Sequence, residues 1–230
     1  MNHLASLSVT LQRGEAIIVA GALFDMDGTL VDSIPAVEGA WAIWAAERGI
    51  PVPPPSMHGK TAQAVVAASG LAVHDREGAE LRLTEIEARP GQRLDALPGA
   101  RALLESLPPD RWGVVTSAAS PVALARFGAT DLPEPMFRVT GDDVSNGKPA
   151  PDPFLTGIAH LESRGHDGVV VAFEDTSAGA TSAASAGCLV IGILGTESRE
   201  QLEPFAHIVL DSLETVRACS SGTELRIRLD

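Results

Sequence analysis

The stretch Ala22-Leu23-Phe24-Asp25-Met26-Asp27-Gly28-Thr29-Leu30 joins an apolar run directly to two aspartates, a glycine and a threonine. In an extended chain the side chains of Asp25 and Asp27 point to the same side. Two carboxylates at the end of a hydrophobic strand repel each other and lose hydration. A bound cation would relieve both effects, but Asp-Gly is also an ordinary turn sequence. The stretch alone leaves both interpretations open, a cation site or a solvated acidic turn.

The composition restricts the class of protein. The 230 residues are 45% hydrophobic and 20% charged, which suits one large globular domain or a core with a smaller insert. The net charge of −13 argues against a nucleic-acid partner. We find neither an apolar run of the roughly 18 residues that a membrane span needs nor a secretory signal. Cys188 and Cys219 have no metal-ligand spacing, so we expect a reducing cytoplasm.

Two kinds of pattern divide the chain. Residues 8–11 and 16–20 predict a short edge hairpin that leads into the strand ending at Asp25. Beyond residue 97, short Val/Ile-rich runs alternate with helical stretches, which is typical of a parallel sheet covered on both faces. We expect strands at 111–116, 136–139, 168–173, 189–193, 207–210 and 223–229, and helices at 99–107, 121–128, 152–163, 177–186, 198–204 and 212–218.

Residues 33–97 carry helical patterns only. Apolar residues recur at three- and four-residue spacing from Ile34 to Ala45, with Ser33 as the expected N-cap and Gly49 as the stop. Further helices are expected at 61–69 and 75–89. We therefore predict an α/β core, 1–32 and 98–230, with an all-helical insert at 33–97. Trp41 and Trp44 are expected in the core of this insert rather than as a platform for a sugar.

Polar residues follow the ends of the predicted parallel strands, where sites in such sheets lie. They are Asp25 and Asp27 after the first strand, Thr116 and Ser117 after the second, Lys148 before the helix at 152–163, and Glu174 and Asp175 after the fourth. Because parallel strands end at one edge, we expect these groups to meet. Taken singly, each has an ordinary structural explanation, such as a helix N-cap at 174–175 or a solvated lysine at 148.

Together these groups suit phosphoryl transfer through a carboxylate. Asp25 is the predicted nucleophile, which forms an aspartyl-phosphate. Asp25, Asp175 and the backbone carbonyl of Asp27 are expected to hold Mg²⁺, which prefers hard oxygen ligands. The free side chain of Asp27 would protonate the leaving alcohol and later deprotonate the attacking water.

The remaining polar groups are expected to support this chemistry. The Thr116 hydroxyl and the Ser117 amide would donate hydrogen bonds to phosphoryl oxygens, and Lys148 would neutralise negative charge. Glu174 is expected to orient water around the ion.

Four segments, in this order, resemble the motifs of the haloacid dehalogenase superfamily. They are Asp25-Met26-Asp27-Gly28-Thr29-Leu30-Val31-Asp32-Ser33, Val115-Thr116-Ser117, Gly147-Lys148-Pro149-Ala150-Pro151-Asp152-Pro153-Phe154 and Phe173-Glu174-Asp175-Thr176-Ser177-Ala178-Gly179. The resemblance implies a Rossmann-like, doubly wound core, a helical cap inserted after the first motif, and Mg²⁺-dependent phosphoryl transfer through Asp25. Asp27 implies a phosphatase or a sugar-phosphate mutase, because the dehalogenases and phosphonate hydrolases of the superfamily lack this acid.

Further segments resemble one subgroup. His58-Gly59-Lys60 and Leu97-Pro98-Gly99-Ala100 are similar to segments of broad-range sugar-phosphate, glycerol-3-phosphate and 2-deoxyglucose-6-phosphate phosphatases. Related mutases carry an arginine shortly after the cap glycine, whereas the only basic residue between Gly59 and Gly70 is Lys60.

We therefore predict a monomeric, Mg²⁺-dependent hydrolase of small sugar or polyol phosphates, with neither nucleic acid nor a membrane as partner. A helical lid would select the leaving group, with His58, Gly59 and Lys60 facing the substrate. For His58 and Lys60 the alternative is that they are ordinary solvent-exposed side chains. The alternative functions are a hexose-phosphate mutase of the β-phosphoglucomutase type, a phosphoglycolate phosphatase, or a phosphosugar-binding protein without catalysis.

Overall fold

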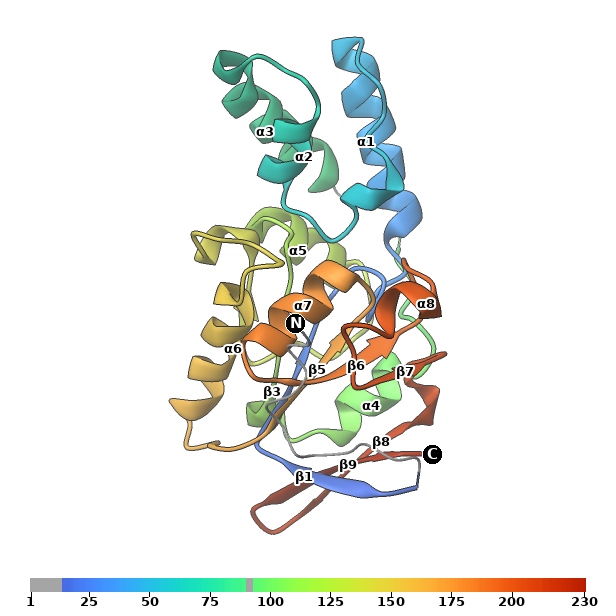
Figure 1. The fold of residues 1–230 in the computed structure, drawn as a ribbon, viewed down its shortest axis with the longest axis vertical. Coiled ribbons are helices and arrows are strands. Elements are labelled where there is room, and N and C mark those ends of the chain that lie inside the picture. The colour runs from blue at the N-terminus through green and yellow to red at the C-terminus, as the bar shows by residue number, and fades with distance from the viewer. Residues whose placement is uncertain (1–13, 90–92) are drawn as a thin grey trace.

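A computed structural model describes residues 14–89 and 93–230 of the chain. A parallel sheet in the strand order β4-β3-β2-β5-β6-β7 forms its centre (Figure 1). Its strands are β2 (Gly21–Phe24), β3 (Trp112–Val115), β4 (Arg138–Val139), β5 (Val170–Glu174), β6 (Leu189–Ile193) and β7 (Ile208–Leu210). The predicted α/β fold with a doubly wound parallel sheet is confirmed.

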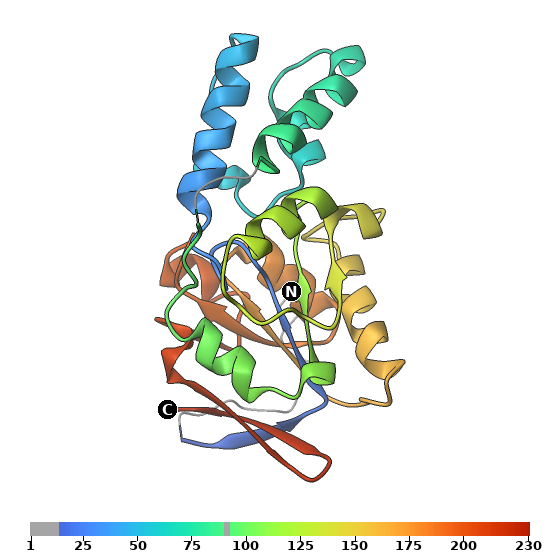
Figure 2. The ribbon, with the colours of Figure 1, turned by 180° about the vertical axis from the view of Figure 1, so that it is seen from behind.

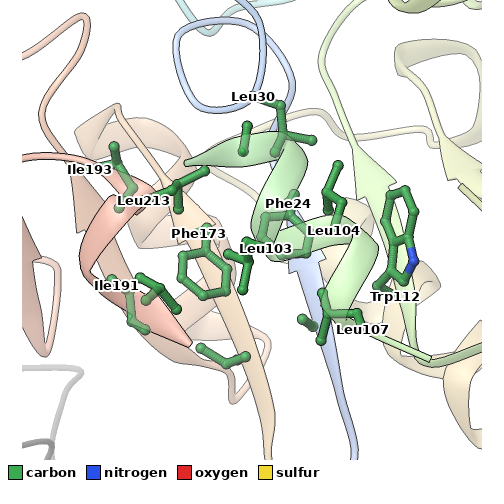
Figure 3. Close-up of a cluster of buried hydrophobic side chains, with 14 of the residues drawn as sticks. Phe24, Leu30, Leu103, Leu104, Leu107, Trp112, Phe173, Ile191, Ile193 and Leu213 are labelled. Carbon is green, nitrogen blue, oxygen red and sulfur yellow. The ribbon is translucent and has the colours of Figure 1, made fainter. Parts of the chain in front are cut away.

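Helices cover both faces of this sheet. They are α4 (Ala100–Ser106) and α5 (Ser120–Gly128) on the face seen in Figure 2, and α6 (Asp152–Glu162), α7 (Ser177–Ser185) and α8 (Arg199–Leu202) on the other. Along β2, Phe24 packs in the cluster with α4 and α5 and Leu23 in the cluster with α6 and α7, because successive strand residues point to opposite faces. Phe24 stacks on Phe173 of β5 with ring centroids 4.7 Å apart, next to Leu103 (Figure 3).

Three helices connect β2 to α4 and stand beyond the carboxyl ends of the strands (Figure 1). They are α1 (Ile34–Arg48), α2 (Ala62–Ala68) and α3 (Val73–Glu87). The helices enclose a hydrophobic cluster of their own, which contains Trp41 and Trp44 as expected. Gly49 ends α1 with a left-handed φ of 64°, also as expected. None of the described helices has the length and apolar character that crossing a bilayer requires.

The two segments that join α1–α3 to the sheet run side by side. The Asp32 amide donates to the Asp95 carbonyl, and the Leu97 amide to the Leu30 carbonyl, both at 2.9 Å. The chain therefore leaves and re-enters the sheet layer at one place. The division into a core and a cap stays a prediction at this point.

A second, antiparallel sheet has the strand order β1-β9-β8 and lies at the end of the molecule opposite to α1–α3 (Figure 1). Its strands are β1 (Ala16–Val19), β8 (Val216–Ser221) and β9 (Glu224–Leu229). The predicted hairpin is not observed as such, because residues 8–11 lie outside the described residues and β1 pairs with β9.

The predicted helix at 212–218 is wrong. Leu213–Thr215 forms a single 3-10 turn, and the chain continues as β8. Val216 lies opposite Leu229 and Ser221 opposite Glu224, so β9 supplies partners to the β8 backbone. Small and β-branched residues of this kind pack well on a paired strand, and this tertiary pairing overrides their local pattern.

The hydrophobic cluster that α1–α3 enclose predicts unequal effects when two leucine side chains of α3 are shortened. Leu83 is completely buried, whereas Leu81 is 62% exposed. Leu83→Ala is expected to lower the free energy of unfolding by about 2–5 kcal/mol because it leaves a cavity. Leu81→Ala, the matched control, is expected to change it by about 0.5 kcal/mol or less. Urea denaturation measures both values, and equal effects would contradict this packing.

Candidate active site

The site begins where β2 and β5 end next to each other. The chain builds β2, β3 and β4 in one direction across the sheet and β5, β6 and β7 in the other, so β2 and β5 flank the switch point. Phe24 lies opposite Phe173, and the Asp25 amide donates to the Phe173 carbonyl at 3.0 Å. This register brings Asp25 beside Glu174 and Asp175 at the carboxyl edge of the sheet.

Three buried carboxylates gather around one ammonium group. Oxygens of Asp25, Glu174 and Asp175 lie within 4.8 Å of one another. The Lys148 Nζ donates to Asp25 Oδ1 and to Glu174 Oε1 at 2.6 Å each, and to the Val115 carbonyl at 2.9 Å. A single positive charge therefore faces three potential negative charges in a region without bulk water.

The electrostatics of this cluster leave negative charge uncompensated. Burial raises the pKa of Asp25 well above its usual value, with Lys148 opposing and Glu174 and Asp175 adding to the rise. Burial and the charge of Glu174 likewise raise the pKa of Asp175 to about 7. Burial lowers the pKa of Lys148, but the charges of Asp25 and Glu174 outweigh this and raise it above its usual value. Lys148 therefore stays charged, but its single positive charge does not offset the burial and mutual repulsion of Asp25 and Asp175.

The residues present fit a divalent cation. Asp25 and Asp175 offer hard oxygen atoms, the ligand type that Mg²⁺ prefers. Asp175 is held by Thr196, whose amide donates to Oδ2 at 3.2 Å, and by the Thr29 hydroxyl, which donates to Oδ1 at 3.2 Å. Asp25 Oδ2 accepts no hydrogen bond from the part of the chain that the structure describes. A cation held between the carboxylates of Asp25 and Asp175 would balance the excess charge.

Glu174 is satisfied by the protein itself. Its Oε1 accepts from Lys148, and its Oε2 accepts from the Thr176 hydroxyl at 3.2 Å. Gly179 leaves room for this carboxylate, because a Cβ there would lie 1.8 Å from Oε1. Glu174 is therefore built to hold Lys148 in place.

The Asp27 side chain has two hydrogen-bond partners, while its predicted freedom from the metal ion stays a prediction. Asp27 Oδ1 accepts from the Ser33 hydroxyl, and Oδ2 accepts from Arg126 Nη1 at 2.8 Å. Ser33 is the N-cap residue of α1 as predicted, but its side chain makes no capping hydrogen bond because it is bonded to Asp27. Pro35 removes one of the amide donors that a cap would use, and the Asp27 carboxylate is a stronger partner for the hydroxyl.

A small cavity lies between the carboxyl edge of the sheet and the helices α1–α3. Asp25, Asp27, Thr116 and Ser117 line it together with His58, Gly59 and Lys60, and its volume is about 50 Å³. The Ser117 hydroxyl donates to the Gly59 carbonyl at 2.8 Å, which links the two parts. His58 is buried, stacks on Trp41 at 4.8 Å between ring centroids, and its Nε2 lies 3.2 Å from Glu38 Oε1. The structure therefore brings every predicted site residue to one place, while their roles stay predictions.

Two residues of this cavity were not identified from the sequence. Arg126 on α5 and Glu87 at the end of α3 both line it, and Arg126 Nη2 lies 3.1 Å from Glu87 Oε1. A signal for Arg126 exists, because it lies three and four residues after Ala123 and Val122 on the buried face of its helix. A charged residue on an apolar helix face indicates a buried partner.

Comparisons with known proteins assign the chain to a family. The sequence model of the haloacid dehalogenase-like hydrolases matches residues 19–187. Hexitol phosphatase A of Escherichia coli (strain K12) is 41% identical over 205 residues, which cover 85% of this chain and 92% of that protein. Glycerol-1-phosphate phosphohydrolase 2 of Saccharomyces cerevisiae is 32% identical over 222 residues, 90% of this chain and 87% of that protein. A crystal structure of a hydrolase from Pseudomonas syringae shares the fold with a TM-score of 0.74 and 24% identity, over 84% of this chain and 94% of that chain.

The excess of buried carboxylates predicts stabilisation by a divalent cation. Mg²⁺ at about 100 times its dissociation constant is expected to add about 2.7 kcal/mol to the free energy of unfolding, seen as a higher Tm. Asp175→Asn should lose most of this shift, whereas Asp211→Asn, which alters an exposed carboxylate, should keep it. Differential scanning fluorimetry with and without EDTA measures the shift. An unchanged shift in Asp175→Asn would exclude Asp175 as a ligand.

The close approach of Gly28 to Asp175 allows a second test of this carboxylate. Its φ is +86°, and a Cβ there would lie 2.0 Å from Asp175 Oδ2. Gly70 has a similar φ of +82° but open space around it. Gly70→Ala should lower the free energy of unfolding by about 1–2 kcal/mol through backbone strain alone. Gly28→Ala should lower it further and also weaken Mg²⁺ binding, as titration calorimetry would show; equal behaviour of the two variants would contradict this close approach.

Proposed function

Because the chain belongs to the haloacid dehalogenase-like hydrolases, we propose that it hydrolyses phosphate monoesters of small sugars or polyols with the help of Mg²⁺. The chain is a phosphoric monoester hydrolase. Two relatives, hexitol phosphatase A and glycerol-1-phosphate phosphohydrolase 2, support polyol phosphates as substrates. The observation that carries the proposal is the group of three buried carboxylates around Lys148.

In the first step, Asp25 attacks the phosphorus atom. Lys148 occupies Oδ1 of Asp25, which leaves Oδ2 to form the new bond to phosphorus. The bond from phosphorus to the substrate oxygen breaks, and Asp27 gives its proton to that oxygen, so the alcohol leaves neutral. The Thr116 hydroxyl and the Ser117 amide donate to the phosphoryl oxygens.

In the second step, water releases the phosphate. Asp27 accepts a proton from the water as the water oxygen bonds to phosphorus. The bond between phosphorus and Asp25 Oδ2 breaks, and the carboxylate is restored on its Lys148 partner. Asp25, Asp175 and the Asp27 carbonyl would hold Mg²⁺, which supplies positive charge to the phosphoryl oxygens when bound. Glu174 keeps Lys148 in place during both steps.

We further propose that residues 33–97 act as a cap on a core of residues 1–32 and 98–230. The cavity of about 50 Å³ is smaller than the roughly 300–1,000 Å³ of ordinary ligand pockets, so α1–α3 must move to admit a sugar phosphate. His58, Gly59 and Lys60 would then contact the leaving group. His58 Nδ1 is buried and has no partner among the described residues, so it is available for a substrate hydroxyl.

Phosphate release from a panel of substrates tests this function. The panel holds a hexitol phosphate, glycerol 1-phosphate, phosphoglycolate, a hexose 1-phosphate and a nucleotide, each with Mg²⁺ and with EDTA. The polyol phosphates should be hydrolysed fastest, and EDTA should stop the reaction. Conversion of the hexose 1-phosphate to the 6-phosphate with little free phosphate would identify a mutase instead. Binding without any hydrolysis would contradict an enzyme.

We expect the Asp25→Asn variant to fold but to lose turnover. The amide is a poor nucleophile, so kcat on a hexitol phosphate should fall by about 10⁴-fold or more. The fold should persist, because the substitution keeps the shape and removes one of the crowded carboxylates. Asp32→Asn, which alters an exposed carboxylate of the same segment, is the matched control and should keep its activity. Full activity in Asp25→Asn would exclude the proposed nucleophile.

A further inference from the structure

Arg126 joins the proposed acid–base residue to the helices above the sheet. It lies on the buried face of α5 and is 7% exposed. Its Nη1 donates to Asp27 Oδ2 at 2.8 Å, and its Nη2 lies 3.1 Å from Glu87 Oε1. Asp27 follows β2, whereas Glu87 is the last residue of α3, and α3 packs against α5. One side chain thus contacts both sides of the cavity.

Stability alone does not explain an arginine at this place. The neighbouring residues on the same helix face are apolar, with Val122 and Phe127 fully buried or nearly so. Replacing a buried ion pair with packed apolar side chains is often neutral or stabilising, because ions lose their hydration on burial. What an apolar residue cannot do is hold two carboxylates at once. The planar guanidinium presents separate N–H groups in a rigid fork, and here each prong takes a different carboxylate.

We propose that Arg126 is a positioning residue for Asp27 and that its bond to Glu87 ties this position to α3. The inference rests on the proposed function, in which Asp27 is the acid and base. With α3 against α5, Glu87 holds one prong of the guanidinium and the other prong holds Asp27 Oδ2. When α3 moves away to admit substrate, Arg126 loses one of its two partners and holds Asp27 less firmly. Asp27 is therefore held in position for proton transfer only while α3 lies against α5.

The contacts also distinguish the two oxygens of Asp27. Arg126 can only donate hydrogen bonds, so Oδ2 must accept, and an ionised oxygen accepts from a guanidinium more strongly than the oxygen of a carboxylic O–H does. The Ser33 hydroxyl at Oδ1 can rotate and either donate or accept. Oδ1 is therefore the oxygen that carries the proton to the leaving group, and Oδ2 is the oxygen by which the carboxylate is held.

Leaving groups of different basicity test this role. Glycerol 1-phosphate needs a proton on its leaving oxygen, whereas p-nitrophenyl phosphate releases a stable phenolate without one. Both substrates are compared by the rate constant of the first step, taken from the burst of alcohol or p-nitrophenol before steady turnover, because the second step needs Asp27 as the base for either substrate. Arg126→Met should lower this rate constant for glycerol 1-phosphate by about 10- to 100-fold, a part of what general acid catalysis contributes. For p-nitrophenyl phosphate the fall should be about 3-fold or less, and the substrate dissociation constant should change little for both.

Two further variants keep the test valid if Arg126→Met folds poorly. Arg126→Lys keeps the charge but cannot bridge both carboxylates, so its loss should have the same selectivity and a smaller size. Glu87→Ala should also lower the first-step rate constant selectively, because the guanidinium then has one partner fewer. Arg138→Met is the matched control, since Arg138 lies over the Phe127 ring of the same helix at 5.1 Å and is not in the cavity wall. It should change the two substrates equally.

A double variant decides between positioning and general damage. If Arg126 acts through Asp27, then Arg126→Met should have almost no further effect on glycerol 1-phosphate in the Asp27→Asn background. Additive losses, equal losses of the first-step rate constant on both substrates, or weaker substrate binding at an unchanged first-step rate constant would each overturn the inference. If Asp27→Asn alone left glycerol 1-phosphate turnover intact, the acid–base role in the proposed function would fail as well. A selective Asp27→Asn with an unselective Arg126→Met would overturn only the role of Arg126.

Discussion

The ammonium group of Lys148, bonded to Asp25 and Glu174 at 2.6 Å each, is the interaction on which the rest of the site depends. Three carboxylates without bulk water repel one another, and burial raises the pKa of Asp25 and of Asp175. Lys148 reduces that repulsion but does not cancel it. This incomplete balance of charge has three consequences. Asp25 is available as a nucleophile, a divalent cation has a place to bind, and Lys148 fixes the orientation of the Asp25 carboxylate.

The parallel sheet makes the balance possible by collecting residues that are far apart in the chain. Lys148 and Asp25 are separated by 123 positions, and Asp175 and Thr29 by 146. Strands that end at one edge supply the carboxylates, and the loops beyond them supply the lysine and the hydroxyls. The approach is close enough that Gly179 has no room for a side chain beside Glu174. The helices α1–α3 close this edge and reduce the site to a small cavity.

Residues at strand ends could be predicted from the sequence because a single topological rule places them. Asp25, Glu174 and Asp175 meet as expected, since strand direction decides where they lie, and Lys148 reaches them from the loop before α6. The partners of Asp27 could not be predicted in this way. Arg126 reaches it from a helix that packs on the sheet, and Glu87 approaches from a separate helical layer, so both contacts depend on tertiary packing.

The same distinction explains the error in secondary structure at 212–218. This segment has a local pattern that suits a helix, but β9, which follows it, pairs with it as a strand. β1 likewise pairs with β9 at the far end of the chain, while its predicted partner, residues 8–11, lies outside the described residues. Local periodicity predicts an element well when its own apolar face decides its packing, as in α1. It fails where a partner distant in the chain supplies the hydrogen bonds.

The central claim is that Asp25 carries the phosphoryl group during the reaction. The most direct measurement is to stop the enzyme with acid during turnover of a hexitol phosphate, reduce the acyl phosphate with borohydride, and sequence the peptide around residue 25 by mass spectrometry. The account predicts homoserine at position 25, with Asp27 and Asp175 unchanged. Homoserine at another carboxylate, or none at all in an enzyme stopped in full turnover, would contradict it.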